Sequence, residues 1–158
     1  MKKKGKVALS CIIIVATIYL IYDFYRPKHI EVNLNSTIYS IDSKLERQTA
    51  ISIIGEHHKK LFGNDILIGK MIVDKDLTYE IKLKREDNRY FEILTKKNNE
   101  FHVINTIGSI ITSTDFDRVW LQLDDINEKY NLVEGYVSGP AKNIEEANDI
   151  ARSIIEGY

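Results

Sequence analysis

Four short segments rich in β-branched and aromatic residues follow one another over residues 65–112. They read DILIGKMIVD, LTYEIKLKRE, RYFEILTKK and EFHVINTIGSIIT, and only a few polar residues separate them. In the second segment, Leu77, Tyr79, Ile81 and Leu83 alternate with polar residues, which is the pattern of a strand with one face in water. Strands with such short connections pair as hairpins. The sequence therefore predicts an antiparallel meander.

One helix is expected before these strands and another after them. Before residue 64, Leu45, Ala50, Ile54 and Leu61 approximate one face of a helix. The stretch KNIEEANDIARSIIEGY predicts the other, because Asn143 can cap it and its apolar residues form a stripe at helical spacing.

The segment over residues 116–130 fits either a strand or a helix. We favour a strand over Arg118 to Leu123, because the preceding segments form a sheet that needs another partner, and a last strand that ends at Gly139-Pro140. The predicted fold class is α+β: an N-terminal transmembrane helix, a helix, an antiparallel meander of five to six strands, and a C-terminal helix packed on one sheet face.

The N-terminus joins a basic flank to an apolar run. Its four lysines are Lys2, Lys3, Lys4 and Lys6, and the run has 16 uncharged residues from Val7 to Tyr22. Three isoleucines stand at its centre: Ile12, Ile13 and Ile14. A cleavable signal peptide needs small residues after the run, where the chain has YDFYRPK instead. The favoured interpretation is a retained signal-anchor, a transmembrane helix over residues 7–25, and whether it is ever cleaved stays open.

Positive flanks of a membrane span stay in the cytoplasm. Residues 1–6 are therefore expected to form a cytoplasmic basic flank, residues 26–38 a connector, and residues 39–158 an extracytoplasmic α+β domain. The expected location is the cell membrane, single-pass, with the N-terminus in the cytoplasm.

Charge and cysteine content exclude several classes of function. Six basic and one acidic side chains among residues 1–28 give +5, which leaves −6 for the rest of a chain whose net charge is −1. A domain of that sign lacks the clustered cations that neutralise phosphates, so nucleic acid is not an expected partner. Cys11 is the only cysteine and lies in the apolar run. The outer domain therefore has no disulfide and no thiol nucleophile.

Candidate metal and catalytic groups are weak. His57 and His58 are adjacent, whereas two zinc ligands on a helix stand at i and i+4. Acids gather near residue 120: Asp115, Asp117, Asp124 and Asp125. They lack the central glycine and the spacing of a calcium loop. No metal, no cofactor and no catalytic residue is therefore predicted.

Aromatic side chains are the candidates for contact with a partner: Trp120, Tyr130 and Tyr136. On a strand, Trp120 faces away from Val119 and Leu121. An outward tryptophan flanked by tyrosines is typical of a binding hot spot. Burial of Trp120 in the core under a helix is the alternative.

The stretches TIGSIITSTDFDRVWLQL and EGYVSGPAKNIEEANDIARSII contain a G-S-I…DF pattern and a G-P-A-K-N turn. In these features residues 62–155 resemble small, uncharacterised membrane-anchored proteins of Gram-positive bacteria. The resemblance implies an extracytoplasmic bacterial setting and brings no reaction with it.

The expected function is tethered docking by a non-enzymatic domain of the bacterial envelope. The span would hold the domain at the membrane, and a sheet face or edge would bind a protein partner. Two alternatives stay open. One is an envelope hydrolase that uses the clustered carboxylates, and the other is a small subunit of a membrane secretion or conjugation complex.

Overall fold

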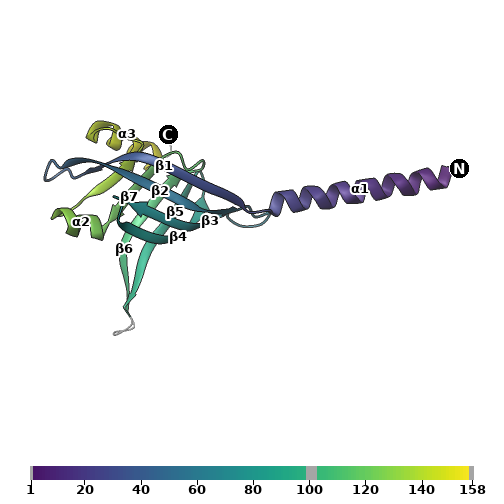
Figure 1. The fold of residues 1–158 in the computed structure, drawn as a ribbon, viewed down its shortest axis with the longest axis horizontal. Helices are drawn as coiled ribbons and strands as arrows, with labels where there is room; N and C mark the ends of the chain where they lie inside the picture. The colour runs from purple at the N-terminus through teal and green to yellow at the C-terminus, as the bar shows by residue number, and fades with distance from the viewer. Residues whose placement is uncertain (1, 99–102, 157–158) are drawn as a thin grey trace.

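The computed structural model describes the backbone of residues 2–98 and 103–156. The elements in chain order are α1 (Lys2–Tyr25), β1 (Lys28–Tyr39), β2 (Glu46–His58), β3 (Ile66–Val73), β4 (Leu77–Glu86), β5 (Arg89–Asn98), β6 (Val103–Ser113), β7 (Val119–Leu123), α2 (Asp124–Tyr130), β8 (Tyr136–Gly139) and α3 (Ile144–Ile155). These strands form a closed barrel in which chain neighbours pair antiparallel and β8 returns to β1. In Figure 1, α1 extends away from the barrel, and the β5–β6 hairpin projects from it in another direction.

The predicted α+β fold with an open meander is wrong, because the sheet closes on itself. The helix expected before residue 64 does not form. Its residues belong to a turn and to β2, which pairs with β1 from Lys28↔His57 to Tyr39↔Glu46. Ile51 and Ile53 point inward and are fully buried, so period two outweighs the approximate helical spacing here. Most of the expected connector over residues 26–38 belongs to β1, which runs from Lys28 to Tyr39.

Other predicted elements are confirmed. In β4, Tyr79, Ile81 and Leu83 are buried while the residues between them are exposed. The ambiguous segment contains both alternatives, since strand β7 is followed directly by the short helix α2. The C-terminal helix begins at the predicted cap, where the Asn143 side chain accepts a hydrogen bond from the N–H of Glu146 at 2.9 Å.

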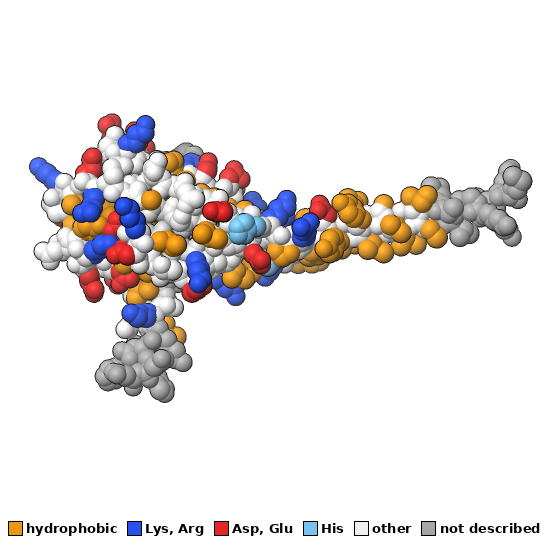
Figure 2. Space-filling model, in the orientation of Figure 1, with side chains coloured by type: hydrophobic (Ala, Val, Ile, Leu, Met, Phe, Trp, Pro, Cys, Tyr) orange, Lys and Arg blue, Asp and Glu red, His pale blue; other side chains and the backbone are white. Residues whose placement is uncertain are grey.

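The predicted transmembrane anchor over residues 7–25 is also wrong. Among the residues that the structure describes, we find no helix whose length and apolar content suffice for a membrane crossing. The apolar run of 16 residues spans only about 24 Å as a helix, against about 30 Å of hydrocarbon core. Three predictions that depend on this anchor are wrong for the same reason: the single-pass membrane location with an extracytoplasmic domain, the signal-anchor, and the membrane as a partner. Figure 2 shows apolar side chains along the shaft of α1.

The barrel interior is a packed apolar core. Its largest fully buried side chains include Ile38, Leu67, Met71, Ile110 and Leu121. Substantial burial of apolar surface of this kind is the main source of stability in a domain without disulfides.

Helix α2 covers one end of the barrel. Its Ile126 is fully buried in the main core. Next to it, the hydroxyl of Tyr79 donates to a carboxylate oxygen of Asp125 at 2.8 Å. The hydroxyl of Tyr130 donates to Asp74 in the β3–β4 turn. These bonds tie the helix to β4 and to the turn before it.

Three rings fill the other end of the barrel. The rings of Tyr90 and Phe116 lie 4.8 Å apart, and the ring of His57 stands edge-on to both. The Nε2 atom of His57 and the hydroxyl of Tyr90 are 2.6 Å apart, within hydrogen-bond distance. Burial lowers the pKa of His57, and nearby Asp65 acts in the opposite direction. Burial likewise raises the pKa of Tyr90 to about 12.

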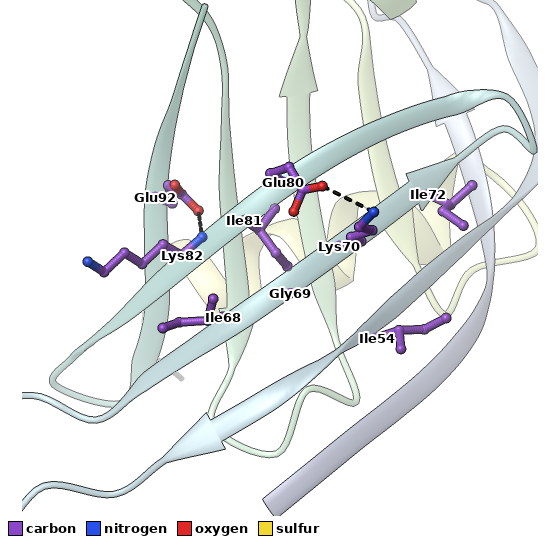
Figure 3. Close-up of a pocket in the computed structure, with 9 residues that line it drawn as sticks. All are labelled: Ile54, Ile68, Gly69, Lys70, Ile72, Glu80, Ile81, Lys82 and Glu92. Carbon is purple, nitrogen blue, oxygen red and sulfur yellow. Dashed lines mark hydrogen bonds and ion pairs between the residues drawn. The ribbon is translucent and has the colours of Figure 1, made fainter. Parts of the chain in front are cut away.

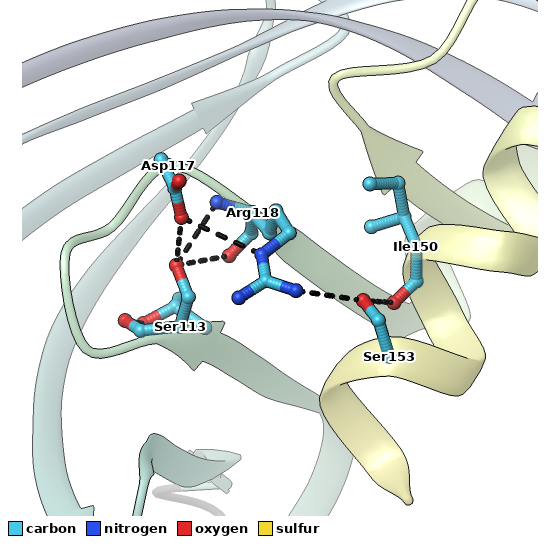
Figure 4. A network of polar contacts seen from close by, with 6 residues as sticks. Ser113, Asp117, Arg118, Ile150 and Ser153 are labelled. Carbon is cyan, nitrogen blue, oxygen red and sulfur yellow. Dashed lines mark hydrogen bonds and ion pairs between the residues drawn. The ribbon is translucent and has the colours of Figure 1, made fainter. Parts of the chain in front are cut away.

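Helix α3 lies against the outside of the barrel. It buries Ala147 and Ala151 and contacts β1, β6, β7 and β8. Figure 4 shows how its C-terminal half is fixed: a guanidinium nitrogen of Arg118 donates to the Ser153 hydroxyl at 3.1 Å. On the strand side, the Ser113 hydroxyl donates to Asp117 at 2.5 Å. The network therefore joins the β6–β7 turn to α3.

Candidate functional site

The junction between β4 and β5, the β4–β5 seam, is closed at one end only. The two strands pair at Lys84↔Phe91, Arg85↔Tyr90 and Glu86↔Arg89. Beyond Phe91, β5 pairs with β6 and turns away from β4. Among the described strands, none pairs with residues 77–83 on the side that faces β5. We call this unpaired side the β4 edge.

The charges of β5 explain why the seam opens. Extending the register by one residue would place Glu92 opposite Leu83, and extending it further would place Lys96 opposite Tyr79. Opposite residues share a face, and both Leu83 and Tyr79 point into the core. Full pairing would therefore carry a carboxylate and an ammonium group into an apolar interior, which is costly. The strand leaves the barrel where its first inward charge occurs.

Glu92 stays in contact with the β4 edge through its side chain. Its Oε2 atom accepts a hydrogen bond from the backbone N–H of Lys82 at 2.5 Å (Figure 3). Burial raises the pKa of Glu92, while this hydrogen bond and the charges of Lys82 and Lys84 act in the opposite direction. Backbone groups alternate along a strand, so the N–H groups of Thr78 and Glu80 point to the same side as that of Lys82. The β4 edge thus offers a row of backbone donors and acceptors.

An apolar furrow lies on the outer wall beside this edge. It has a volume of about 540 Å³. Four isoleucines line it: Ile54, Ile68, Ile72 and Ile81. Ile54 and Ile68 are 39% and 44% exposed, although both stand in the middle of strands. Glu80, Lys82 and Glu92 line the same furrow, so it reaches the β4 edge (Figure 3).

Two glycines shape the wall under the furrow. Gly55 and Gly69 are register partners on β2 and β3. A Cβ on Gly55 would lie 2.5 Å from the carbonyl oxygen of Ile68, and one on Gly69 would collide with the carbonyl oxygen of Ile54. The two backbones therefore approach too closely for any side chain at these positions. Ile54 and Ile68 precede the two glycines and point to the outer face.

The apolar surface continues beyond the furrow. A second depression of about 400 Å³ shares Ile68 with it and extends to Leu61 and Phe62 in the β2–β3 turn. Phe62 is 88% exposed. Large apolar side chains that remain exposed side by side mark interaction surfaces.

Two of the charged residues beside the furrow form an ion pair with each other. The ammonium of Lys70 lies 3.2 Å from a carboxylate oxygen of Glu80, and both side chains are mostly exposed. An exposed pair of this kind contributes at most about 1 kcal/mol. Its main effect is to place opposite charges along a surface that a partner would contact.

The three aromatic residues predicted to bind a partner do not form one site. The rings of Trp120 and Tyr136 lie 5.6 Å apart on β7 and β8, and the ring of Tyr39 lies 5.6 Å from that of Tyr136. Tyr136 packs against the small core under α3. Tyr130 lies elsewhere, on α2, under the guanidinium of Arg47. Trp120 and Tyr136 are brought together, Tyr130 is not, and their role in binding stays a prediction.

The acid cluster is also divided. Asp115 and Asp117 precede β7, and Asp124 and Asp125 follow it. The strand between them rises about 17 Å at about 3.4 Å per residue, so the two pairs do not share a cleft. In the described part of the chain, no three of the metal-binding residue types His, Cys, Asp and Glu are placed to hold an ion. The arrangement does not favour the hydrolase alternative.

Comparison of the chain with protein families, with curated proteins and with solved structures finds no match.

Proposed function

We propose that the chain is a non-enzymatic protein-interaction domain that binds an extended segment of a partner protein along the β4 edge. Added strands bind through main-chain hydrogen bonds, and neighbouring pockets for side chains provide specificity. The β4 edge has the first feature and the apolar furrow has the second. The observation that carries the proposal is the unpaired run of residues 77–83 beside the furrow.

The chemistry of the site defines the partner segment. Its alternate residues face the furrow side and the core side of the sheet. On the core side, positions opposite Tyr79, Ile81 and Leu83 require apolar side chains, because those residues are buried. On the outer side, an acid suits the position opposite Lys82 and a base suits the position opposite Glu80.

Selection from random linear peptides displayed on phage tests this proposal. The full chain is immobilised, and peptides that alternate apolar and polar residues are expected to be enriched. Their binding should fall by about tenfold or more in Lys82→Pro, because proline removes the N–H that faces the partner. Lys82→Ala is the matched control, since it loses the charge and keeps the N–H.

Enrichment of such peptides with loss of binding in Lys82→Pro alone supports the proposal. No enrichment, or equal binding by the proline and alanine variants, contradicts it. Ile68→Glu adds a second readout, because a charge in the furrow should weaken the same peptides.

A further inference from the structure

We infer that one partner of the β4 edge is a second copy of this chain, so that two barrels join through paired β4 strands. The inference rests on the proposed function of this edge and names its occupant. Its basis is the order of charges in β4, which makes the strand complementary to itself.

The two outward charges next to Ile81 make β4 complementary to a second, antiparallel copy of itself. Glu80 and Lys82 point to the exposed face on either side of Ile81, which points into the core. Antiparallel pairing about a two-fold axis at Ile81 puts Glu80 opposite Lys82 of the partner subunit. The same axis puts Lys82 opposite Glu80 of the partner subunit. Two attractive cross-strand pairs form at once, each of a kind that stabilises a sheet.

Neighbouring registers do not have this property. An axis at Glu80 puts two carboxylates directly opposite each other, and an axis at Lys82 does the same with two ammonium groups. Like charges directly opposite each other destabilise a pair of strands. The charges therefore select the register centred on Ile81.

The backbone satisfies the same register. The N–H and C=O groups of Glu80 and Lys82 face the β4 edge, as the bond from the N–H of Lys82 to Glu92 shows. Residues of a hydrogen-bonded antiparallel pair exchange both of their bonds. Each of the two charge pairs is such a pair, so polar groups of both edges are satisfied together. The Glu92 carboxylate has to leave the N–H of Lys82 for this to occur.

The core side is compatible with this axis. Ile81 lies opposite Ile81 of the partner subunit, and Tyr79 lies opposite Leu83 of the partner subunit. All three residue types are apolar or largely apolar, and all are buried in the barrel. The interface is isologous, and each copy uses its single β4 edge, so assembly stops at the dimer.

Charge reversal tests the inference on the full chain. Sedimentation velocity in reducing buffer is suitable, because Cys11 is exposed and unpaired. The wild-type chain is expected to dimerise. Glu80→Lys and Lys82→Glu should each weaken the dimer on the order of tenfold or more, since either change creates two like-charge pairs. A mixture of the two variants should form a heterodimer, because the mixed pairs are again opposite in charge.

Recovery of dimer in the mixture, and in the double variant Glu80→Lys/Lys82→Glu, supports the inference and shows that the variants are folded. A wild-type chain that stays monomeric, or a dimer unaffected by both reversals, overturns it. If selected peptides still bind a monomeric chain and fail with Lys82→Pro, the proposed function stands and only the second copy is excluded. If the charge-dependent dimer forms and no peptide binds, the inference stands, and binding of a foreign segment is excluded.

Discussion

The carboxylate of Glu92 accepts a hydrogen bond from the backbone N–H of Lys82 at 2.5 Å, although the two strands no longer pair at this position. Glu92 thus occupies the place that the carbonyl group of a paired strand would take. Inward-pointing charges at sheet edges prevent uncontrolled edge-to-edge association. A partner strand therefore has to displace Glu92, and the contact limits which strands can bind.

Removal of the two inward charges of β5 should close the seam. In the double variant Glu92→Leu/Lys96→Leu, β5 can remain paired with β4 beyond Phe91, because both new side chains suit the core. The N–H of Glu80 should then exchange with solvent slower by about tenfold or more, as measured by native-state hydrogen exchange. Glu92→Gln/Lys96→Gln is the control, since buried amides are also costly. Unchanged exchange at Glu80 in the leucine variant would show that charge does not hold the seam open.

Glu92 should also give the protein a specific dependence on pH. Its pKa is raised above the ordinary value of 4.5, chiefly by burial. A raised pKa means that the folded state favours the protonated acid, so the stability linked to this group is present below 4.5 and is lost as the pH rises through the folded pKa. The free energy of unfolding in urea, measured for wild type and Glu92→Gln, should diverge in that window, with wild type losing more. Parallel curves for the two proteins would contradict this assignment.

The local pattern of β4 could be read from the sequence, whereas the closure of the sheet could not. Tyr79, Ile81 and Leu83 alternate with exposed residues, and this pattern depends only on neighbours in the chain. In β2, both Ile53 and Ile54 are isoleucine, one buried and one exposed, so the residue types do not alternate. The helical spacing that misled the prediction arises from outward residues such as Ile54. Ile54 is one of the apolar residues that line the furrow.

The site depends on register, which no single segment contains. Glu92 has no unusual sequence context, and it matters because Lys84↔Phe91 fixes the face on which position 92 would lie. Gly55 and Gly69 become meaningful only once β2 and β3 are aligned. Gly69 within the predicted strand DILIGKMIVD is one available signal, since glycines inside strands often mark close approach of backbones, whereas Gly55 lies in the segment predicted as a helix. The complementary charges of Glu80 and Lys82 are visible in the sequence. The sequence does not show that the β4 edge beside them is unpaired.

Gly69→Ala should destabilise the barrel and alter the furrow. The added methyl group would collide with the carbonyl oxygen of Ile54 and lie 2.5 Å from the Cα of Gly55. Overpacking against backbone of this kind costs about 1–3 kcal/mol of unfolding free energy. Gly63→Ala is the comparison, because nothing lies within 4 Å of its Cβ and only its φ of +91° opposes the change. An unfolding free energy of Gly69→Ala equal to that of wild type would refute the close approach of β2 and β3.

Trp120→Ala separates the sequence-based binding hypothesis from the site proposed here. The half-buried indole lies beside the ring of Tyr136 at 5.6 Å, so its removal should cost less stability than the about 3–5 kcal/mol typical of a fully buried tryptophan. Peptides selected on the β4 edge should bind this variant as they bind wild type, at temperatures where it is folded. Calorimetry measures both quantities. Loss of peptide binding by the folded variant would show that the partner site includes Trp120 and is not confined to the β4 edge.

His57 should make the barrel less stable in mild acid. Burial lowers its pKa below the ordinary value of 6.5, so the unfolded chain takes up a proton before the folded protein does. Stability linked to His57 is therefore present above 6.5 and is lost as the pH falls through the lowered pKa. The charged groups that act on it are Asp65, Lys59, His58 and Lys28, and only Asp65 favours the protonated ring. His57→Gln should flatten the fall in urea stability below pH 6.5, whereas His58→Gln keeps His57 and should retain most of that fall, because burial is the main cause of the lowered pKa. A steep fall that persists in His57→Gln would place the titrating group elsewhere.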